Sequence, residues 1–329
     1  VAALIVGLVV RLAWTIIASG TPDHRLNDAG EYVRVAEQLA DGDTPTIAGR
    51  PTAFIKPGYP AALVPVVWAS RLSGGRISTQ FGAGLLNVAL GTTTIGLSAI
   101  MARQWLGARA AGPTAWLVAL CPPAIFVTSP ALAETLITFL GVAVIVLATS
   151  VAGSRADSGR PAWKGVVAIG VLIGFGSLVR GNGLVLLPVV VLVLRGRTLR
   201  QTLVTASALI AVVAAVLTPW AIRNRIEVGV GAPLSTGNAS SLCLAYRNGA
   251  TGLPDFSEEA LRDCYTRSPY DDRSLYVPGD PHVYLSNFDA PDEVAWYRRT
   301  TRQGIAWALH HPGDVVTTNW NKTVEVFRT

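Results

Sequence analysis

Long runs without a single charged residue constrain this chain more than any other feature. A run of about 20 apolar residues is the length at which an α-helix crosses the hydrocarbon core of a bilayer. Four uncharged runs reach that length, and they lie at Ile77–Ala102, Ala110–Ala133, Thr135–Ser154 and Gln201–Ile222. The sequence therefore predicts an α-helical polytopic membrane protein, and it excludes a disordered chain and an ordinary cytosolic enzyme.

Charged residues make up only 15% of the chain, against about 25% in soluble domains, and they are unevenly distributed. Residues 1–222 hold 16 Lys and Arg against 8 Asp and Glu, whereas residues 223–329 hold 11 against 13. Basic residues normally anchor the cytoplasmic loops of membrane proteins, so we attribute the basic excess to the membrane and not to nucleic-acid binding. We predict a transmembrane module over 1–222 and a water-exposed extracytoplasmic domain over 223–329.

The two ends of the sequence indicate a piece of a longer membrane protein. Val1 lies inside an apolar run, and the chain stops at Thr329 without a final span, so we expect truncation before further spans. The first segment carries no convincing cleavage site and is expected to be a retained span. Arg11 lies in the middle of that span, and the sequence leaves open whether it pairs with a neighbouring helix or serves function.

Two shorter apolar runs, Gly165–Val179 and Gly181–Leu194, meet at Arg180. One helix through both would be about 45 Å long, which is too long for a bilayer, so we expect two short helices joined by a turn. The Pro-rich segment Pro57–Ser70 is expected to lie at the interface, within an outer loop 20–76. This topology gives about seven spans and places the basic loops between them on one side, as the positive-inside rule requires.

The polar residues that stand out then gather at the outer face. A short amphipathic helix is expected to begin at Asn27 or Asp28 and to stop near Gly42. Asp28 and Glu31 lie three residues apart, on one face of its first turn. They could carry chemistry, or they could only favour the helix dipole.

Four further residues are candidates for function on the same face. Lys56 could bind a lipid phosphate or only extend to the headgroups. Glu134 and Arg180 are isolated charges among apolar residues, and such charges at membrane depth are costly and usually functional. Arg223 follows the last span and the interface residue Trp220, where it could contact a phosphate or headgroups.

The order and spacing of these residues resemble the GT-C glycosyltransferases, and within them the polyprenyl-phosphate-sugar-dependent group that includes the protein O-mannosyltransferases and the aminoarabinose transferase of lipid A. Five short elements carry the resemblance: Asp28–Tyr32, Lys56–Tyr59, Ser129–Leu136, Gly174–Arg180 and Trp220–Asn224. The chain has Ala29 and Gly58 where many relatives have a second acid and a second proline. The expected fold is a GT-C-like helical bundle with an outer-face juxtamembrane helix and a mixed α/β or loop-rich extracytoplasmic domain.

The resemblance implies an inverting glycosyltransferase that acts on the outer side of the cell membrane. It would move mannose, or a pentose such as arabinose, from a polyprenyl-phosphate donor to a hydroxyl of a glycan, lipid or protein. Asp28 would be the general base, with Glu31 as the second catalytic candidate. The donor phosphate would be bound by Lys56, Arg180 and Arg223.

Glu134 would orient the acceptor or a metal. Some relatives bind a divalent cation, but the sequence offers no firm ligand set, and the four histidines, His24, His282, His310 and His311, form no convincing metal cluster. The alternative functions are a membrane transporter and a non-catalytic assembly subunit of cell-envelope synthesis. A transporter is disfavoured because the polar residues gather at one face and no inverted repeat is visible.

In the predicted outer domain, Cys243 and Cys264 are expected to form a disulfide, since an oxidising compartment favours one. Cys121 lies in a predicted span and should be free. The residues Leu234–Gly252 look like a loop, and Glu293–His311 is typical of an amphipathic helix ended by Pro312.

Overall fold

The computed structural model describes residues 1–19, 27–47, 49–158, 162–196, 198–251, 257–265 and 293–326. The chain divides into two compact units. The first unit comprises Val1–Thr44 and Lys56–Pro219, and the second comprises Pro45–Ile55 and Trp220–Thr329. The second unit thus includes a segment, Pro45–Ile55, that the sequence analysis assigned to the outer loop of the transmembrane module.

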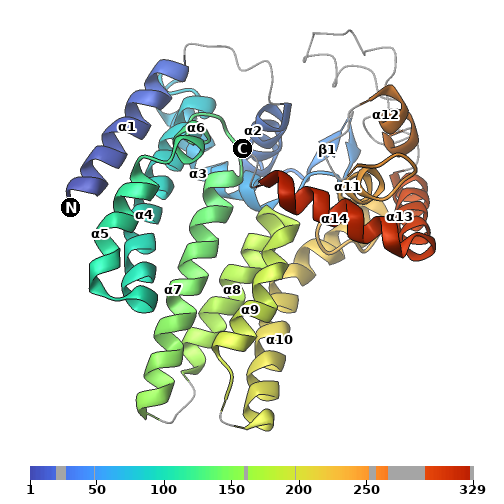
Figure 1. Cartoon of the computed structure of the whole chain (residues 1–329). Coiled ribbons are helices and arrows are strands. Elements are labelled where there is room, and N and C mark those ends of the chain that lie inside the picture. The colour runs from blue at the N-terminus through green and yellow to red at the C-terminus, as the bar shows by residue number, and fades with distance from the viewer. Residues whose placement is uncertain are drawn as a thin grey trace. The chain divides into compact units, whose positions relative to one another are not determined.

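The first unit is a bundle of helices (Figure 1). In chain order they are α1 (Ala2–Ala18), α2 (Asn27–Ala40), α3 (Gly58–Leu72), α4 (Thr79–Leu106), α5 (Ala108–Ala119), α6 (Pro122–Phe126), α7 (Glu134–Ser158), α8 (Trp163–Val179), the short 3-10 helix η1 (Gly181–Val185), α9 (Leu186–Val193) and α10 (Leu199–Arg223). The break that the sequence predicted at Arg180 is present, and α2 begins and ends within two residues of its predicted limits.

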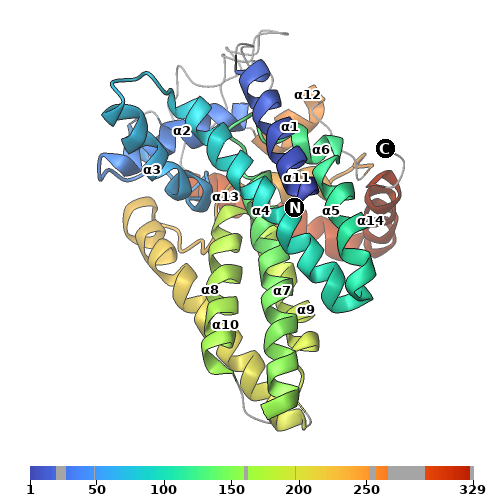
Figure 2. The ribbon, with the colours of Figure 1, turned by 90° about the vertical axis from the view of Figure 1, so that its left-hand side faces the viewer.

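Three helices of the described residues are long and apolar enough to cross a membrane, at Thr79–Leu106, Glu134–Ser154 and Leu199–Val228. Three shorter apolar helices accompany them, at Ala2–Ala18, Trp163–Val179 and Gly181–Val193. These features indicate a multi-pass membrane protein. Helices α7, α8 and α10 run side by side in both views of the bundle (Figures 1 and 2).

Small residues let α8 approach α10 closely. A Cβ atom built on Gly170 would lie 2.8 Å from the Cβ of Val212, and one built on Gly174 would lie 2.7 Å from the Cβ of Val216. Glycines four residues apart lie on one helix face, and small residues at such spacing are typical of helix contacts inside membranes. These contacts hold α8 against α10. They thereby help to position Arg180, which directly follows α8.

The run Ala110–Ala133, which the sequence analysis treated as one span, is divided by Pro122 and Pro123 into α5, α6 and a turn. Proline has no N–H, so these two prolines cannot donate to the carbonyls four residues earlier, at Val118 and Ala119. Arg11 of α1 supplies the missing donors. Its guanidinium donates to Ala119 O and to Val118 O, each at 2.9 Å.

Arg11 is therefore the partner of a broken neighbouring helix, which is the structural alternative that the sequence left open. Its side chain is almost completely buried, at 1% exposure. In an apolar environment an unpaired carbonyl costs several kcal/mol, because no water replaces the lost donor. Arg11 therefore compensates for the two hydrogen bonds that Pro122 and Pro123 cannot make.

The second unit is also mostly helical in the part that the structure describes. It contains the two-residue antiparallel strands β1 (Thr46–Ile47) and β2 (Arg50–Pro51), the π-helix η2 (Asn224–Val228), and the helices α11 (Asn238–Ala245), α12 (Glu258–Tyr265), α13 (Glu293–His310) and α14 (Pro312–Val326). A mixed α/β domain is not seen among these residues, and the loop prediction for Leu234–Gly252 is wrong because α11 lies within it. The helix predicted at Glu293–His311 is confirmed.

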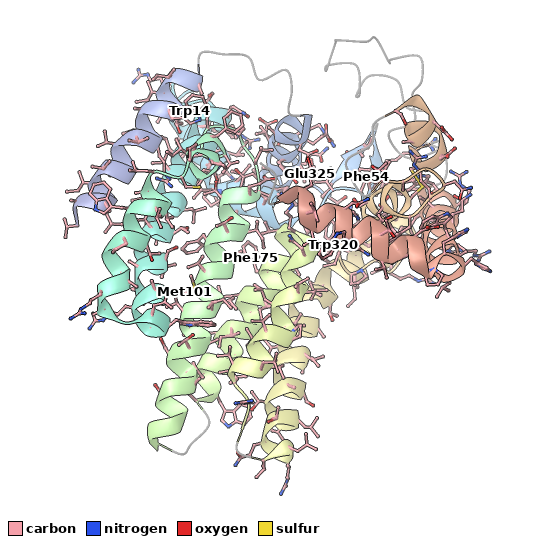
Figure 3. The ribbon with its side chains drawn as sticks, viewed as in Figure 1. Trp14, Phe54, Met101, Phe175, Trp320 and Glu325 are labelled. Atoms are coloured by element: carbon pink, nitrogen blue, oxygen red, sulfur yellow. A yellow bond between two sulfur atoms is a disulfide. The ribbon has the colours of Figure 1, made fainter. Side chains whose placement is uncertain are left out.

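A disulfide joins α11 to α12, as the sequence predicted. Cys243 and Cys264 are bonded, with their Cα atoms 5.6 Å apart, and both are buried. The indole of Trp296 in α13 donates to Cys264 O at 3.0 Å and packs against Phe54, with ring centroids 5.6 Å apart. Figure 3 labels Phe54. Cys121 is free, also as predicted.

We expect Arg11→Leu to destabilise the first unit by about 1–3 kcal/mol for each carbonyl left without a donor. Thermal unfolding in detergent measures the loss, with Arg109→Leu, an exposed arginine, as the control. In a Pro122→Ala, Pro123→Ala background the backbone N–H groups return, so the cost of Arg11→Leu should fall. An equal cost in both backgrounds would contradict the pairing of Arg11 with this helix break.

The disulfide should stabilise the second unit by about 3 kcal/mol, given that the two cysteines lie 21 residues apart. We expect the double substitution Cys243→Ser, Cys264→Ser to increase the rate at which trypsin cuts residues 220–329. The matched control is Cys121→Ser, which removes a free thiol. Equal protease resistance of the double variant and the wild type would show that helix packing alone holds α11 and α12.

Candidate functional site

Five charged residues from four separate segments converge at one end of the first unit. Asp28 and Glu31 lie in α2, Lys56 lies two residues before α3, Glu134 is the first residue of α7, and Arg180 directly follows α8. The Asp28 carboxyl interacts electrostatically with the other four. We call these five residues the charged cluster. Figures 1 and 2 show α2 and α3 at the end of the bundle where α7 begins.

The contact between α3 and α8 brings Lys56 close to Arg180. A Cβ atom on Gly58 would lie 2.4 Å from the backbone nitrogen of Val179 and 2.5 Å from the carbonyl carbon of Leu178. Only glycine permits this approach, since real Cβ atoms do not come so close to backbone. Gly58 is thus required here by the packing of α3 on the end of α8.

Arg180 and Glu134 form an ion pair across the start of α7 and the end of α8. Their side chains stay partly open, at 42% and 35% exposure respectively. A guanidinium has five N–H donors, so one carboxylate does not occupy all of them. Arg180 can therefore keep its pairing with Glu134 and still donate to an anion that reaches the site.

The environment shifts the pKa values of Asp28 and Lys56 in opposite directions. Burial raises the pKa of the Asp28 carboxyl, nearby Glu134 adds to the rise, and Arg180 and Lys56 oppose it. Burial also lowers the pKa of the Lys56 amine, with a further contribution from Arg180. The Asp28 residue nevertheless keeps an exposed surface, so a reactant can approach it. A carboxylate with a raised pKa is a stronger base.

Glu31 has a different environment from Asp28. It is 5% exposed, and its carboxylate is bound by Arg34, three residues later, at 2.6 Å. The sequence analysis did not single out Arg34, although the spacing of three on a helix favours such a pair. Glu31 is thereby held in the first turns of α2, where its charge acts on Asp28.

A buried amide that the sequence analysis missed connects the elements that hold the charged cluster. Asn87 of α4 is completely buried and donates to Pro130 O at 2.9 Å, and the Tyr59 hydroxyl donates to its Oδ1 at 3.4 Å. Tyr59 in turn contacts Tyr32 edge to face, with centroids 5.3 Å apart. This chain links α2, α3, α4 and the turn before Glu134. An amide within an apolar run was the signal that could have revealed it.

Arg223 is not part of the charged cluster but belongs to the second unit. Its guanidinium donates to Thr52 O and to Pro45 O, and it is paired with Glu227 at 2.8 Å. Among the described residues, no group of three or more His, Cys, Asp or Glu could hold a metal ion. His24 and His282 lie outside those residues.

The ionised carboxylate of Asp28 should lower the free energy of unfolding at neutral pH. Because folding raises its pKa, the folded chain binds this proton more tightly than the unfolded chain, and stability falls as the pH rises through the folded pKa. We therefore expect Asp28→Asn to raise the thermal unfolding temperature at pH 7.5. The gain in unfolding temperature should shrink toward pH 4, which is near the ordinary pKa of an aspartate, about 3.9.

The control for this measurement is Asp41→Asn at the other end of α2. A hydrogen bond from Arg71 lowers the pKa of the Asp41 carboxyl, so its removal should not stabilise the fold at neutral pH. A stabilisation by Asp41→Asn equal to that by Asp28→Asn would contradict the burial of the Asp28 charge as the cause.

Comparisons with protein-family models, with curated proteins and with solved structures find no match to this chain. Its function is therefore argued from the chemistry of the charged cluster and from the membrane character of the helices that hold it.

Proposed function

We propose that this protein is an inverting, GT-C-like glycosyltransferase that uses a sugar linked to a polyprenyl phosphate. The observation that carries the proposal is the convergence of Asp28 with Lys56, Glu134 and Arg180 at one end of an apolar helical unit. A carboxylate with a raised pKa beside two cations offers a general base and an anion site together. A lipid-linked donor would reach such a site from the bilayer.

In this mechanism Asp28 removes the proton from an acceptor hydroxyl as the oxygen attacks the anomeric carbon of the sugar. The new glycosidic bond forms on the face opposite the leaving group, and the bond between that carbon and the phosphate oxygen breaks. The electron pair leaves with the phosphate, and the proton stays on Asp28. The configuration of the sugar is inverted in one displacement.

Lys56 and Arg180 stabilise the charge that develops on the departing phosphate. Donors that the fold holds in place before the reaction need no reorganisation during it. Glu134 holds the Arg180 guanidinium through their ion pair and is close enough to influence Asp28 electrostatically. It is therefore suited to orient the phosphate-binding cation and the acceptor.

The location of the cluster argues against a transport pathway. All of its members lie at the ends of helices: two near the beginning of α2, one at the beginning of α7, one just before α3 and one just after α8. A transporter site is expected near the bilayer midplane, at the interface of structural repeats. A surface site at helix ends suits a reaction between a membrane-bound donor and a glycan, lipid or protein acceptor on the outer side of the cell membrane.

The test is transfer of radiolabelled sugar from polyprenyl-phosphate mannose and polyprenyl-phosphate arabinose by the protein in membranes. We expect the Asp28→Asn variant to lose about 10²–10⁴-fold in rate. Lys56→Ala and Arg180→Ala should each lose about 10²–10³-fold. Asp41→Asn, an exposed aspartate paired with Arg71 at the other end of α2, is the matched control and should keep the wild-type rate.

Transfer by the Asp28→Asn variant at the wild-type rate would remove Asp28 as the base and leave Glu31 and Glu134 as candidates. If the wild-type protein used no lipid-linked sugar, the glycosyltransferase proposal would fail in favour of a transporter or an assembly subunit.

A further inference from the structure

The second unit contains the end of a candidate membrane span. Helix α10 continues into the π-helix η2, and together they form the apolar segment Leu199–Val228. The second unit begins at Trp220, so its first residues are part of this span. Two of them, Ile222 and Ile226, lie four residues apart and are exposed. The second unit is therefore attached to a segment that can enter the bilayer, and its other helices are held near a membrane surface.

Helix α13 packs against α11 through one face. Trp296, Thr300 and Gly304 are buried at intervals of four residues along it, and such intervals place side chains on one side of a helix. A Cβ atom built on Gly304 would lie 2.9 Å from Cγ of Leu242 in α11. The missing side chain of this glycine therefore permits the contact between the two helices.

The opposite face of α13 is exposed and carries two basic and two apolar side chains. Arg298, Arg302, Ile305 and Leu309 follow one another at spacings of four, three and four residues, and all four are exposed. At 3.6 residues per turn they lie on the side of the helix away from Thr300. A surface helix of a domain in water normally turns its apolar stripe toward the core, whereas α13 exposes Ile305 and Leu309.

The next helix, α14, repeats this arrangement. Its side toward the rest of the unit includes Thr318, which is buried, and Lys322, whose ammonium lies 5.4 Å from the centroid of the Tyr246 ring. Val316 and Trp320 lie four residues apart on the opposite side and are 71% and 66% exposed. The four exposed apolar residues of the two helices, which we call the outer apolar set, are Ile305, Leu309, Val316 and Trp320.

We propose that the outer apolar set, together with Arg298 and Arg302, docks on the anionic lipid headgroups of the bilayer. The apolar side chains then enter the boundary between headgroups and acyl chains, where amphipathic helices lie and where tryptophan is enriched. The two guanidinium groups pair with lipid phosphates at the same level.

The charge of α13 is complementary to an anionic surface. Its one acid, Glu293, accepts hydrogen bonds from the Thr52 hydroxyl at 2.8 Å and from the Ala53 N–H at 3.0 Å, inside the second unit. The exposed stripe of α13 therefore carries positive charge alone, from Arg298 and Arg302. Each basic residue near an anionic lipid surface favours docking roughly fivefold.

The candidate span at the start of the second unit makes the bilayer the favoured occupant of this face. A surface that is covalently held beside its binding partner meets it at a high effective concentration, so contacts that are weak in free solution suffice. This inference rests on the membrane character of the chain and on the second unit alone. It does not depend on the proposed transfer of sugar.

A fluorescent probe on a single cysteine tests the docking in the full chain, in nanodiscs of phosphatidylcholine and phosphatidylglycerol. Cys121→Ser removes the free thiol, and the disulfide keeps Cys243 and Cys264 from reacting. In this background, Ile305→Cys and Val316→Cys each place one probe within the outer apolar set.

The matched controls are Gln303→Cys on α13 and Asp314→Cys on α14. Both residues are exposed, and each lies two positions from its test residue, which turns it to another side of the same helix. We expect bromine atoms on the lipid acyl chains to quench the probes at Ile305 and Val316 several-fold more strongly than the two control probes. Acrylamide, a neutral quencher dissolved in water, should give the opposite order.

The double substitution Arg298→Gln, Arg302→Gln tests the lipid charge. It should lower the ratio of docked to undocked probe at Ile305 by roughly fivefold for each arginine removed. In nanodiscs of phosphatidylcholine alone the same substitutions should make no difference. An equal ratio with and without the arginines in anionic lipid would overturn the assignment of anionic headgroups.

Strong quenching of the Ile305 and Val316 probes by acrylamide, without quenching by brominated lipid, would place the outer apolar set in water and overturn the inference. Protection from both quenchers would also overturn it, in favour of a second copy or another protein that covers this face. Trypsin resistance of residues 220–329 in detergent shows that the labelled unit is folded, and Leu309→Cys and Trp320→Cys replace any variant that lacks it. Docked probes in a protein that transfers no lipid-linked sugar would leave the inference intact while the proposed function fails.

Discussion

An apolar surrounding offers no water to a backbone group that has lost its partner, and the first unit depends on how the chain meets that constraint. The two prolines after α5 remove the donors for two carbonyls, and Arg11 replaces them from another helix. Asn87 does the same for the carbonyl of Pro130 in the turn before α7. These two polar side chains thus supply donors where a helix breaks or a turn leaves a carbonyl without a helical partner.

The same constraint gives the charged cluster its chemistry. Burial opposes the charge of both Asp28 and Lys56, and it does so in opposite pKa directions, upward for the acid and downward for the amine. When the charged form of a group is unfavourable in the unliganded site, a reaction or a ligand that changes that charge gives the largest gain in free energy. The destabilisation expected from the Asp28 charge would be the counterpart of its proposed role as a base.

The sequence allowed the members of the cluster to be predicted on different grounds. Glu134 and Arg180 stand out as isolated charges among apolar residues, Asp28 lies in the first turn of an amphipathic helix, and Lys56 precedes a Pro-rich apolar segment. The structure brings the four together. Other features depend on residues far away in the sequence. The carbonyl partners of Arg223 lie 171 and 178 residues earlier and were missed, and the pairing of Arg11, which the sequence left open, depends on prolines in another helix. The helix α11 was missed because it forms within a Ser- and Gly-rich stretch where local propensity favours a turn.

The second unit uses two charged side chains, Arg223 and Glu293, to hold its segment Pro45–Ile55, and this has a physical reason. The segment has only a two-residue strand pairing of its own, so most of its backbone groups need partners from elsewhere. Apolar packing is non-directional and would tolerate a slip along the chain, whereas hydrogen bonds to particular carbonyl and N–H groups fix the register. A slip of one residue in an extended segment moves its end by about 3.3 Å. Arg223 contributes two donors in a rigid fork and Glu293 two acceptor oxygens, so the pair defines the register of this segment within the second unit.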